Sequence, residues 1–291
     1  MSLNVDGTTS EVERIELNLL LEAIFQRYGY DFRDYAIGSV ERRLGQFRDE
    51  NKLSTYSEVT AKVLRDRAFF HSLMPYFSVS VTSLFRDPFF YVALAEQVLP
   101  RLRSWAHFKV WHAGCATGEE VYSHAILLSE AGIYDRSMLY ATDISQPALE
   151  TAKAGIYSLE VIRKGTANYQ SAGGQASLSD YYHARYEAAV MRPEIRRRMT
   201  FARHNLAMDT SFGEMQVIIC RNVLIYFAEA LQNKVLELFW DSLDTGGFLC
   251  LGDKESLSFT SVADRFDIVD ERARIYKKRS SPRERPCDAS G

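Results

Sequence analysis

The chain has 291 residues, a length that suits one large domain or two smaller ones. Its hydrophobic residues (46%) and charged residues (25%) occur in proportions typical of soluble globular proteins. The formal net charge of -3 argues against bulk electrostatic attraction to nucleic acid, so any basic surface has to be local.

Cysteine usage and the N-terminal sequence bear on the compartment. Cys115, Cys220, Cys250 and Cys287 form no C-x-x-C pair, and three of them lie in or beside apolar segments. This pattern favours reduced thiols in a cytosolic protein over a disulfide framework or a zinc site. The N-terminus lacks a signal-peptide pattern, and no apolar run is long enough to span a bilayer. We therefore expect a cytoplasmic protein that binds no metal.

The first part of the chain is expected to form an N-terminal helical domain over residues 10–76. Residues 1–9 are polar and are expected to be disordered. Ser10, followed three residues later by Glu13, fits a capping box that starts a helix. Apolar residues then recur at helical spacing in four successive segments, which end near residues 28, 50, 67 and 76.

The second of these helices, over about residues 36–50, contains a pair of arginines. Its apolar residues would pack on one side, and Arg42 and Arg43 would lie on the other side. Acidic residues surround the pair, so it is as consistent with an ordinary solvated face as with a docking surface.

From residue 77 to residue 279, expected strands alternate with expected helices. The strands are 109–113, 138–142, 199–204, 215–220 and 247–252, followed by a closing hairpin of 266–269 and 274–278. Helices are expected near 87–103, 118–131, 147–154 and 228–243. The alternation predicts an α/β fold with a mostly parallel sheet covered on both faces and an antiparallel edge. Residues 280–291 are expected to form a disordered tail.

One interval, about residues 157–198, interrupts this alternation. It contains several tyrosines and few aliphatic residues, and it is too long for a plain connection. We interpret it as a small inserted subdomain. It is rich in arginine, with Arg196, Arg197 and Arg198 in succession, and it shows no obvious pair of strands.

The stretch VWHAGCATGEE, residues 110–120, predicts a buried strand that runs into a glycine-bearing loop. Open parallel sheets bind ligands beyond the carboxyl ends of their strands, where this loop would lie. Its G-x-x-x-G spacing differs from the G-x-G-x-x-G of dinucleotide sites, and Glu119 and Glu120 would repel a pyrophosphate. A ligand with a positive centre and no phosphate, such as S-adenosylmethionine, fits better.

Asp143 ends the next expected strand, in the sequence YATDI. A carboxylate at this edge can accept hydrogen bonds from both hydroxyl groups of a ribose. Alternatively, Asp143 caps the helix that begins near Pro147. The glycine loop that precedes it favours the ribose-binding role.

Several longer motifs lie in the same region. They are TSLFRD (82–87), AGCATGEE (113–120), ATDI (141–144), AGIY (154–157), HNL (204–206), CRNVLIYF (220–227), and the pairs GG (246–247) and LG (251–252). Over about residues 11–279 the sequence therefore resembles the chemotaxis receptor methyltransferases of the CheR family. CRNVLIYF is the most specific of these motifs, whereas many methyltransferases have a version of the glycine loop.

The resemblance implies a class I methyltransferase, with a Rossmann-like sheet and S-adenosylmethionine as cofactor. The implied reaction transfers a methyl group to glutamate side chains of bacterial chemoreceptors and leaves S-adenosylhomocysteine. A glutamate carboxylate is already ionised at neutral pH, so the reaction needs alignment and desolvation rather than a general base.

The resemblance also implies roles at the methionyl end of the cofactor. Arg86 would lie beside the methionyl carboxylate, Thr82 would contact the same end, and Glu120 would lie near the ammonium group. Gly114 would let the loop approach the cofactor. Ser80 stands where family members often have asparagine, so its contact differs from the family pattern.

At the nucleoside end, the resemblance implies that Asp143 holds the ribose. Asn205 and Leu206 would frame the adenine, and Arg221 and Asn222 would line the floor of the pocket.

For catalysis, the resemblance implies that Tyr226 flanks the transferred methyl group and that Arg86, beside the methionyl carboxylate, is the second catalytic residue. Simpler alternatives remain open for each assignment. Arg86 could pair with Asp87, Glu120 could be a first-turn acid favoured by the helix dipole, and Tyr226 could be a core aromatic next to Phe227.

The expected partner is the cytoplasmic helical region of a chemoreceptor, whose methylated glutamates lie in acidic stretches. Arg42 and Arg43, or Arg196, Arg197 and Arg198, could dock it. Some family members bind a receptor tether through the insert by strand addition. This insert shows no obvious pair of strands, so we do not predict tether binding here. Alternative readings are a class I methyltransferase for nucleic acid or a small molecule, and a non-catalytic cofactor-binding module. We expect a monomer without membrane insertion.

Overall fold

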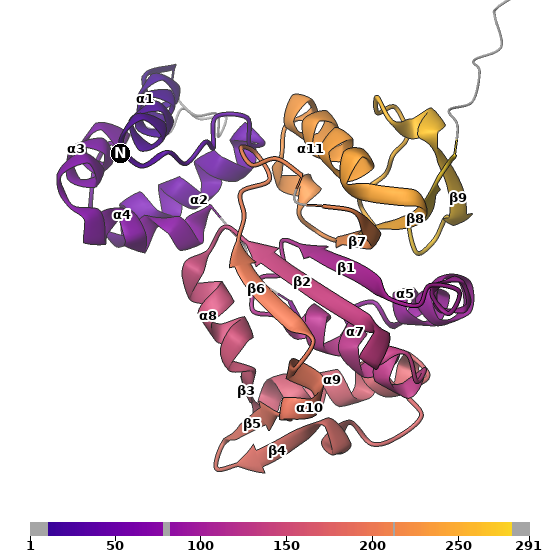
Figure 1. The fold of residues 1–291 in the computed structure, drawn as a ribbon. Helices are drawn as coiled ribbons and strands as arrows, with labels where there is room; N and C mark the ends of the chain where they lie inside the picture. Colours follow the sequence, from indigo (N-terminus) through magenta and orange to yellow (C-terminus); the bar gives the residue numbers. More distant parts are fainter. Residues whose placement is uncertain (1–10, 78–81, 212, 281–291) are drawn as a thin grey trace, which may run out of the picture. The chain divides into compact units, whose positions relative to one another are not determined.

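The structure is a computed structural model that describes residues 11–77, 82–211 and 213–280. The chain divides into two compact units, a helical unit that also contains residues 225–232 and a sheet unit that contains the rest (Figure 1). The expectations for Ser10, Ser80, Cys287 and the two terminal segments concern residues outside the described ranges. None of the helices in the described ranges has the length and apolarity needed to cross a bilayer.

The helical unit confirms the helices expected in the first part of the chain. They are α1 (Glu11–Tyr28), α2 (Ile37–Glu50), α3 (Tyr56–Arg65), α4 (Arg67–Leu73) and the 3₁₀ turn η1 (Met74–Tyr76). Leu17, Leu20 and Ile24 recur on one face of α1, where they are fully buried. Polar side chains begin the later helices, since Thr55 caps α3 and Asp66 caps α4.

The sheet unit has the expected mostly parallel sheet. Its strands are β1 (Phe108–Ala113), β2 (Ser137–Asp143), β6 (Met199–Arg203), β7 (Met215–Cys220), β8 (Leu243–Leu251), β9 (Phe266–Asp270) and β10 (Ile275–Lys278). In space they follow the order β6-β2-β1-β7-β8-β10-β9. Neighbours from β6 to β8 run parallel, and β10 runs antiparallel to β8 and β9, so the expected closing hairpin is confirmed.

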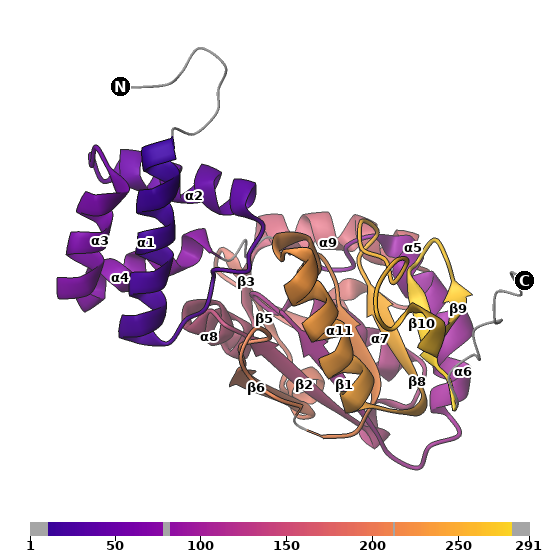
Figure 2. The same cartoon turned by 90° about the horizontal axis from the view of Figure 1, so that it is seen from above.

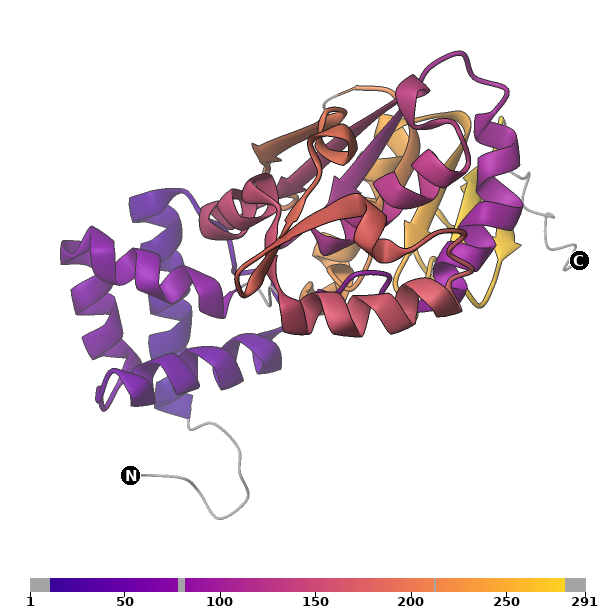
Figure 3. The ribbon, with the colours of Figure 1, turned by 90° about the horizontal axis from the view of Figure 1, so that it is seen from below.

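Helices cover both faces of this sheet (Figures 2 and 3). They are α5 (Pro88–Ala93), the π-helical turn η2 (Leu94–Val98), α6 (Leu99–Leu102), α7 (Glu119–Glu130), α8 (Gln146–Ala154) and α11 (Glu229–Ser242). Successive residues of β1 point to opposite faces, as in any strand. Trp111 therefore packs edge-on against Phe239 of α11, and His112 lies against His124 of α7. The helix expected over residues 87–103 is interrupted by η2.

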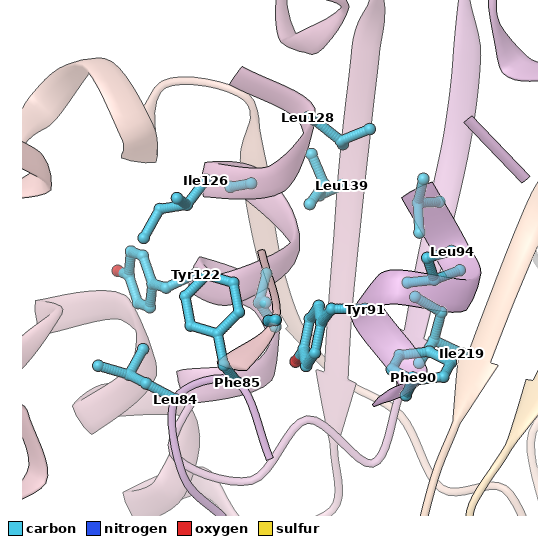
Figure 4. Close-up of a cluster of buried hydrophobic side chains, with 14 of the residues drawn as sticks. Leu84, Phe85, Phe90, Tyr91, Leu94, Tyr122, Ile126, Leu128, Leu139 and Ile219 are labelled. Carbon is cyan, nitrogen blue, oxygen red and sulfur yellow. The ribbon is translucent and has the colours of Figure 1, made fainter. Parts of the chain in front are cut away.

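A hydrophobic core lies between the sheet and the helices α5 and α7 (Figure 4). Phe85, Tyr91 and Tyr122 contribute large side chains that are almost fully buried. Val110 and Leu139 meet them from the sheet. This packing holds the start of α5 and the start of α7 against the carboxyl edge of the sheet, which positions the loops described below.

The insert is more regular than its sequence suggests. It contains β3 (Ile156–Ser158), α9 (Leu159–Ser171), the 3₁₀ turn η4 (Leu178–Tyr181), β4 (Tyr182–Arg185), β5 (Ala188–Met191) and α10 (Pro193–Arg196). The three strands form an antiparallel sheet of order β3-β5-β4. The expectation that the insert lacks a strand pair was wrong. Its strands are short, and the β4–β5 turn places Tyr186 at a φ of 53° instead of using an Asn-Gly signature.

Candidate functional site

The strand order reverses between β1 and β7, where connections lead away to opposite sides of the sheet. Ligands of open α/β sheets bind at such a switch point, beyond the carboxyl ends of the strands. β1 ends at Ala113 and continues into the glycine loop, and β7 ends at Cys220 and continues into Arg221 and Asn222. The structure therefore brings the predicted loop and the start of the CRNVLIYF run, residues 220–224, to the same edge of the sheet.

The glycine loop needs glycine at both Gly114 and Gly118. Gly114 has a φ of +80°, and a Cβ atom there would lie 2.5 Å from Cγ2 of Val223. Gly118 has a φ of +93°, and a Cβ atom there would lie 2.8 Å from Cβ of Ala152. Both conformations favour glycine, and both positions lack space for a side chain. The loop thus passes directly against the segment that follows β7.

Asp143 ties the end of β2 to the glycine loop. Its Oδ2 atom accepts a hydrogen bond from the backbone N–H of Ala116 at 2.8 Å, and its Oδ1 atom accepts one from Ser145 at 2.8 Å. Burial raises the pKa of Asp143, while these N–H donors act in the opposite direction. Ser145, and not Asp143, caps α8, because its side chain accepts from Ala148. Backbone N–H groups of Ala116, Ile144 and Ser145 thus fix the carboxylate at the end of β2.

Arg221 lies in a buried ionic cluster between α5, α7 and β7. Its Nη1 atom lies 3.0 Å from Oε2 of Glu120, and its Nη2 atom lies 2.6 Å from Oδ2 of Asp87. The side chain is only 2% exposed, and its guanidinium covers the ring of Phe90 at 4.1 Å. Opposite charges therefore surround a group that could not otherwise be buried.

Two histidines extend this cluster beneath the loop. His112 contacts Oε1 of Glu120 through Nδ1 and contacts Nδ1 of His124 through Nε2, each at 3.2 Å. Burial alone would raise the pKa of Glu120, but His112 and Arg221 lower it by more. The pKa therefore lies below its ordinary value, and the carboxylate is held ionised. Burial, with the neighbouring His112, lowers the pKa of His124 to about 3. Glu120 thus lies in the first turn of α7 and also contacts His112 of β1 and Arg221 after β7.

The TSLFRD segment brings Arg86 to the start of α5. Its side chain is 37% exposed, and its Nε atom lies 3.9 Å from Oδ2 of Asp87. The same Asp87 oxygen is much closer to Arg221. Asp87 is therefore mainly a partner of Arg221. Thr82 is half-buried at the start of the same segment.

Asn205 and Leu206 follow β6, on the other side of β2. The Asn205 side-chain oxygen accepts from the backbone N–H of Ala207 at 3.0 Å, and its own N–H donates to Asp209 at 2.7 Å. Leu206 is 8% exposed. These contacts form a turn at the same edge of the sheet as Asp143.

Glu255 is a residue at this edge that sequence reasoning missed. It follows β8, is only 4% exposed, and its carboxylate accepts hydrogen bonds from the backbone of residues 222–224. Glu255 stands four residues after the end of β8, in LGDKES, and Asp253 lies closer to the strand, so the sequence gives no clear signal for it.

Tyr226 belongs to the helical unit, although the CRNVLIYF run begins in the sheet unit. Its backbone oxygen accepts from the N–H of Ala36 at 2.9 Å, and the Arg43 guanidinium lies 4.9 Å from its ring centroid. Arg43 is itself fixed by hydrogen bonds to Ser39 and to the backbone oxygen of Phe77.

These contacts correct the prediction that Arg43 lies on the solvent-facing side of α2. Arg43 is 7% exposed, and burial lowers its pKa, so it is a packed residue and not a docking residue. The periodicity failed here because an arginine can lie on the buried side when its guanidinium finds carbonyl and aromatic partners. Arg42 is exposed, as expected.

The arginines of the insert are partly engaged within the sheet unit. Arg196 donates to the backbone oxygen of Lys153 at 2.6 Å, and Arg197 pairs with Asp135. Arg198 is half-buried. Arg197 nevertheless has a side chain that is 54% exposed, so part of this basic surface faces solvent.

The strand order, the glycine loop at the switch point and the acid at the end of the next strand define a class I methyltransferase. Comparison with known families agrees. The CheR methyltransferase SAM-binding domain matches residues 80–275, and the CheR methyltransferase all-alpha domain matches residues 15–77. The chain belongs to the CheR methyltransferase family.

Individual relatives cover most of the chain. A putative methyltransferase Cher3 of Pseudomonas putida is 46% identical over 264 residues, which span 91% of this chain and 97% of that protein. A chemotaxis protein methyltransferase of Vibrio anguillarum is 30% identical over 278 residues, which span 90% and 94%. An uncharacterized 104.1 kDa protein of Rhodobacter capsulatus is 35% identical over 258 residues, and this chain spans only 26% of its length.

Proposed function

We propose that this protein transfers methyl groups from S-adenosylmethionine to glutamate side chains in the cytoplasmic helical region of bacterial chemoreceptors. The products would be γ-glutamyl methyl esters and S-adenosylhomocysteine. The observation that carries the proposal is the Asp143 carboxylate, held beside the glycine loop at the switch point. Family membership and the relatives named chemotaxis protein methyltransferase support the choice of reaction. Such a protein would act in the cytoplasm.

The residues at the switch point fit this cofactor. Gly114 and Gly118 leave backbone where side chains would clash, so a ligand can approach the loop closely. Both oxygens of Asp143 are fixed by backbone donors, and the carboxylate would accept a further hydrogen bond from a ribose hydroxyl. Glu119 and Glu120 at the start of α7 disfavour a phosphate-bearing ligand and suit one with positive charge.

Thr82, Arg86 and Glu120 would hold the methionyl end of the cofactor. The Arg86 guanidinium is partly exposed and would pair with the methionyl carboxylate. Glu120, held ionised by Arg221 and His112, would attract the ammonium group. Arg221 would act by fixing Glu120, because its own guanidinium is occupied by Glu120 and Asp87.

The remaining assignments concern the nucleoside and the reacting groups. Asp143 would hold the ribose, Asn205 and Leu206 would frame the adenine, and Asn222 would line the floor. The bound cofactor supplies an electrophilic methyl group on a sulfonium centre. Tyr226 would flank the transferred methyl group. The substrate carboxylate is already ionised at neutral pH, so the transfer needs alignment and no general base.

Receptor docking would use exposed basic side chains. Arg42 on α2 and the surface formed by Arg196, Arg197 and Arg198 are the candidates in the described part of the chain. Both could attract the acidic stretches that surround methylated glutamates.

The direct test is methyl transfer from radiolabelled S-adenosylmethionine to the cytoplasmic region of a receptor encoded with this chain. We expect label on the receptor that mild base releases, as it does from a carboxyl ester. A Tyr226→Phe variant should label more slowly, and Arg42→Gln should mainly raise the KM for the receptor. Base-stable label, or no transfer to any co-encoded receptor, would contradict the proposal.

A further inference from the structure

Glu255 gathers backbone donors from two loops that leave neighbouring strands. Its Oε1 atom accepts from the N–H groups of Val223 and Leu224, both at 2.8 Å. Its Oε2 atom accepts from the N–H groups of Asn222 at 3.0 Å and Gly252 at 2.6 Å. One side chain therefore binds the segment after β7 to the segment after β8.

The chemistry of these contacts requires an ionised carboxylate. Four N–H groups converge on two oxygens, and a carboxylate only accepts and offers about four lone-pair positions. A neutral amide would point its own N–H donors at two of these donors. Burial raises the pKa of Glu255, but the four N–H groups act against that rise because they stabilise the charged form.

The contacts fix a backbone conformation that would otherwise be unfavourable. Asn222 has a φ of +60°, in the left-handed region. Its N–H, and those of the next two residues, have left the strand ladder, and in a buried loop each would cost free energy without an acceptor. Gly252 passes so close that a Cβ atom there would lie 2.8 Å from both the Asn222 nitrogen and Oε2 of Glu255.

The fixed segment reaches the proposed cofactor pocket directly. Val223 occupies the space that a Cβ atom on Gly114 would need, so a shift of Val223 changes the position of the glycine loop. Asn222, next to it, is a proposed pocket residue. The geometry thus connects Glu255, through the backbone of residues 222–224 and the side chain of Val223, to both sides of the switch point.

We propose that Glu255 is a positioning residue that holds Asn222 and Val223 in the conformation that binds the adenosyl cofactor. This inference rests on the proposed function. Glu255 acts through its backbone contacts, and it contributes an acceptor set that no neutral side chain reproduces.

The test uses the full chain and compares Glu255→Gln with wild type. Glutamine has nearly the same size but replaces one acceptor oxygen with a donor group. Two quantities are measured, the Kd for S-adenosylhomocysteine by calorimetry and backbone amide hydrogen exchange without cofactor. We expect the Kd to rise about tenfold or more, and exchange at residues 222–224 to accelerate by a similar factor. Exchange at Trp111 in β1 should change little.

Two further variants complete the comparison. Glu271→Gln, on an exposed turn, is the matched control and should leave both quantities unchanged. Glu255→Asp keeps the charge but shortens the side chain by one methylene, so it should recover part of the affinity. If Glu255→Gln is too unstable to assay, Glu255→Asp replaces it, and wild-type binding and exchange in that variant would overturn the proposal.

Other outcomes are equally decisive. A Kd for Glu255→Gln within twofold of wild type would overturn the proposal, as would uniform acceleration of exchange that includes Trp111. If the wild-type chain does not bind S-adenosylhomocysteine, the proposed function fails. The exchange measurement would still show whether Glu255 holds residues 222–224, because it needs no cofactor.

Discussion

At the scale of single residues, the site depends on charged groups that are buried together. Glu120 is shared between Arg221 and His112, and Asp87 pairs with Arg221. Burying such ion pairs costs desolvation free energy. Removing one partner lowers stability strongly, because the other charge stays buried without compensation. The cluster therefore specifies where Glu120 and Asp87 lie more than it adds stability.

Replacing Arg221 by methionine tests this cluster. Glu120 and the partly buried Asp87 would lose their main cationic partner, so we expect the free energy of unfolding to fall by about 3 kcal/mol. The measurement is urea denaturation at neutral pH. Arg42→Met, at an exposed position, is the control and should change stability by less than about 0.5 kcal/mol. Equal effects of the two substitutions would contradict a buried cluster.

His124 makes stability depend on pH. Its folded pKa of about 3 lies below the ordinary value near 6.5, so the unfolded chain binds a proton that the folded chain does not. The unfolded state is therefore favoured increasingly as pH falls from about 6.5 toward 3. This residue alone should reduce the free energy of unfolding by up to about 1.4 kcal/mol per pH unit.

A His124→Asn variant isolates this contribution. Asparagine keeps a polar partner for His112 but does not titrate. We expect the variant to lose less stability than wild type between pH 6.5 and pH 4.5, measured by urea denaturation at several pH values. Parallel curves for the two proteins would show that His124 is protonated in the folded chain.

At the scale of elements, the candidate site at the carboxyl edge of the sheet is formed by close contact between loops and not by long side chains. The glycine loop and the segment after β7 meet at Gly114 and Val223, with no space for a methyl group between them. Because the loops follow strands of a rigid sheet, their positions are set by the packing of α5 and α7 beneath them.

Gly114→Ala tests this contact against a matched control. Gly132 also has a positive φ, +68°, but a Cβ atom there would meet nothing within 4 Å. Gly132→Ala should therefore cost only the backbone term, about 1 kcal/mol, whereas Gly114→Ala should cost about 1–3 kcal/mol more. Adding Val223→Ala should restore part of the loss in the Gly114 variant. No rescue would mean that the two loops are not in contact.

The sequence predicted the sheet and its helices well because each element carries a local signal. The run from Met215 to Cys220 is apolar throughout, as a doubly covered parallel strand requires. The insert was harder, because β4 and β5 have four residues each and depend on pairing rather than on composition.

Within the site, motif reasoning identified the residues at strand ends but not their partners. Asp143 and the glycine loop stand out in sequence, and the structure brings them together. Glu255 and the buried pairing of Arg221 depend on contacts between residues that are 31 to 134 positions apart. No local pattern encodes such contacts, which is also why Arg43 was assigned to the wrong side of α2.

At the scale of the whole molecule, the CRNVLIYF run passes from the sheet unit to the helical unit at residue 225. The segment from Tyr226 to Ala228 is held by backbone hydrogen bonds to Ala36 and Asp34. The helical unit therefore fixes the backbone from Tyr226 to Ala228. This role is separate from the proposed docking of a receptor.

An Arg43→Met variant should lower kcat several-fold if the Arg43 guanidinium orients the Tyr226 ring. The affinity for S-adenosylhomocysteine should stay near that of wild type, because the proposed cofactor residues lie in the sheet unit. In a Tyr226→Ala background, the same substitution should have little further effect on kcat. An additive loss in the double variant would show that Arg43 acts independently of Tyr226.

The most direct measurement for the whole account is calorimetric titration of the full chain with S-adenosylhomocysteine, alongside an Asp143→Ala variant and NADH as a phosphate-bearing competitor. We predict that wild type binds one equivalent, that Asp143→Ala binds at least about tenfold more weakly, and that NADH does not compete. Tight binding of NADH, or unchanged binding by the Asp143 variant, would contradict the site described here.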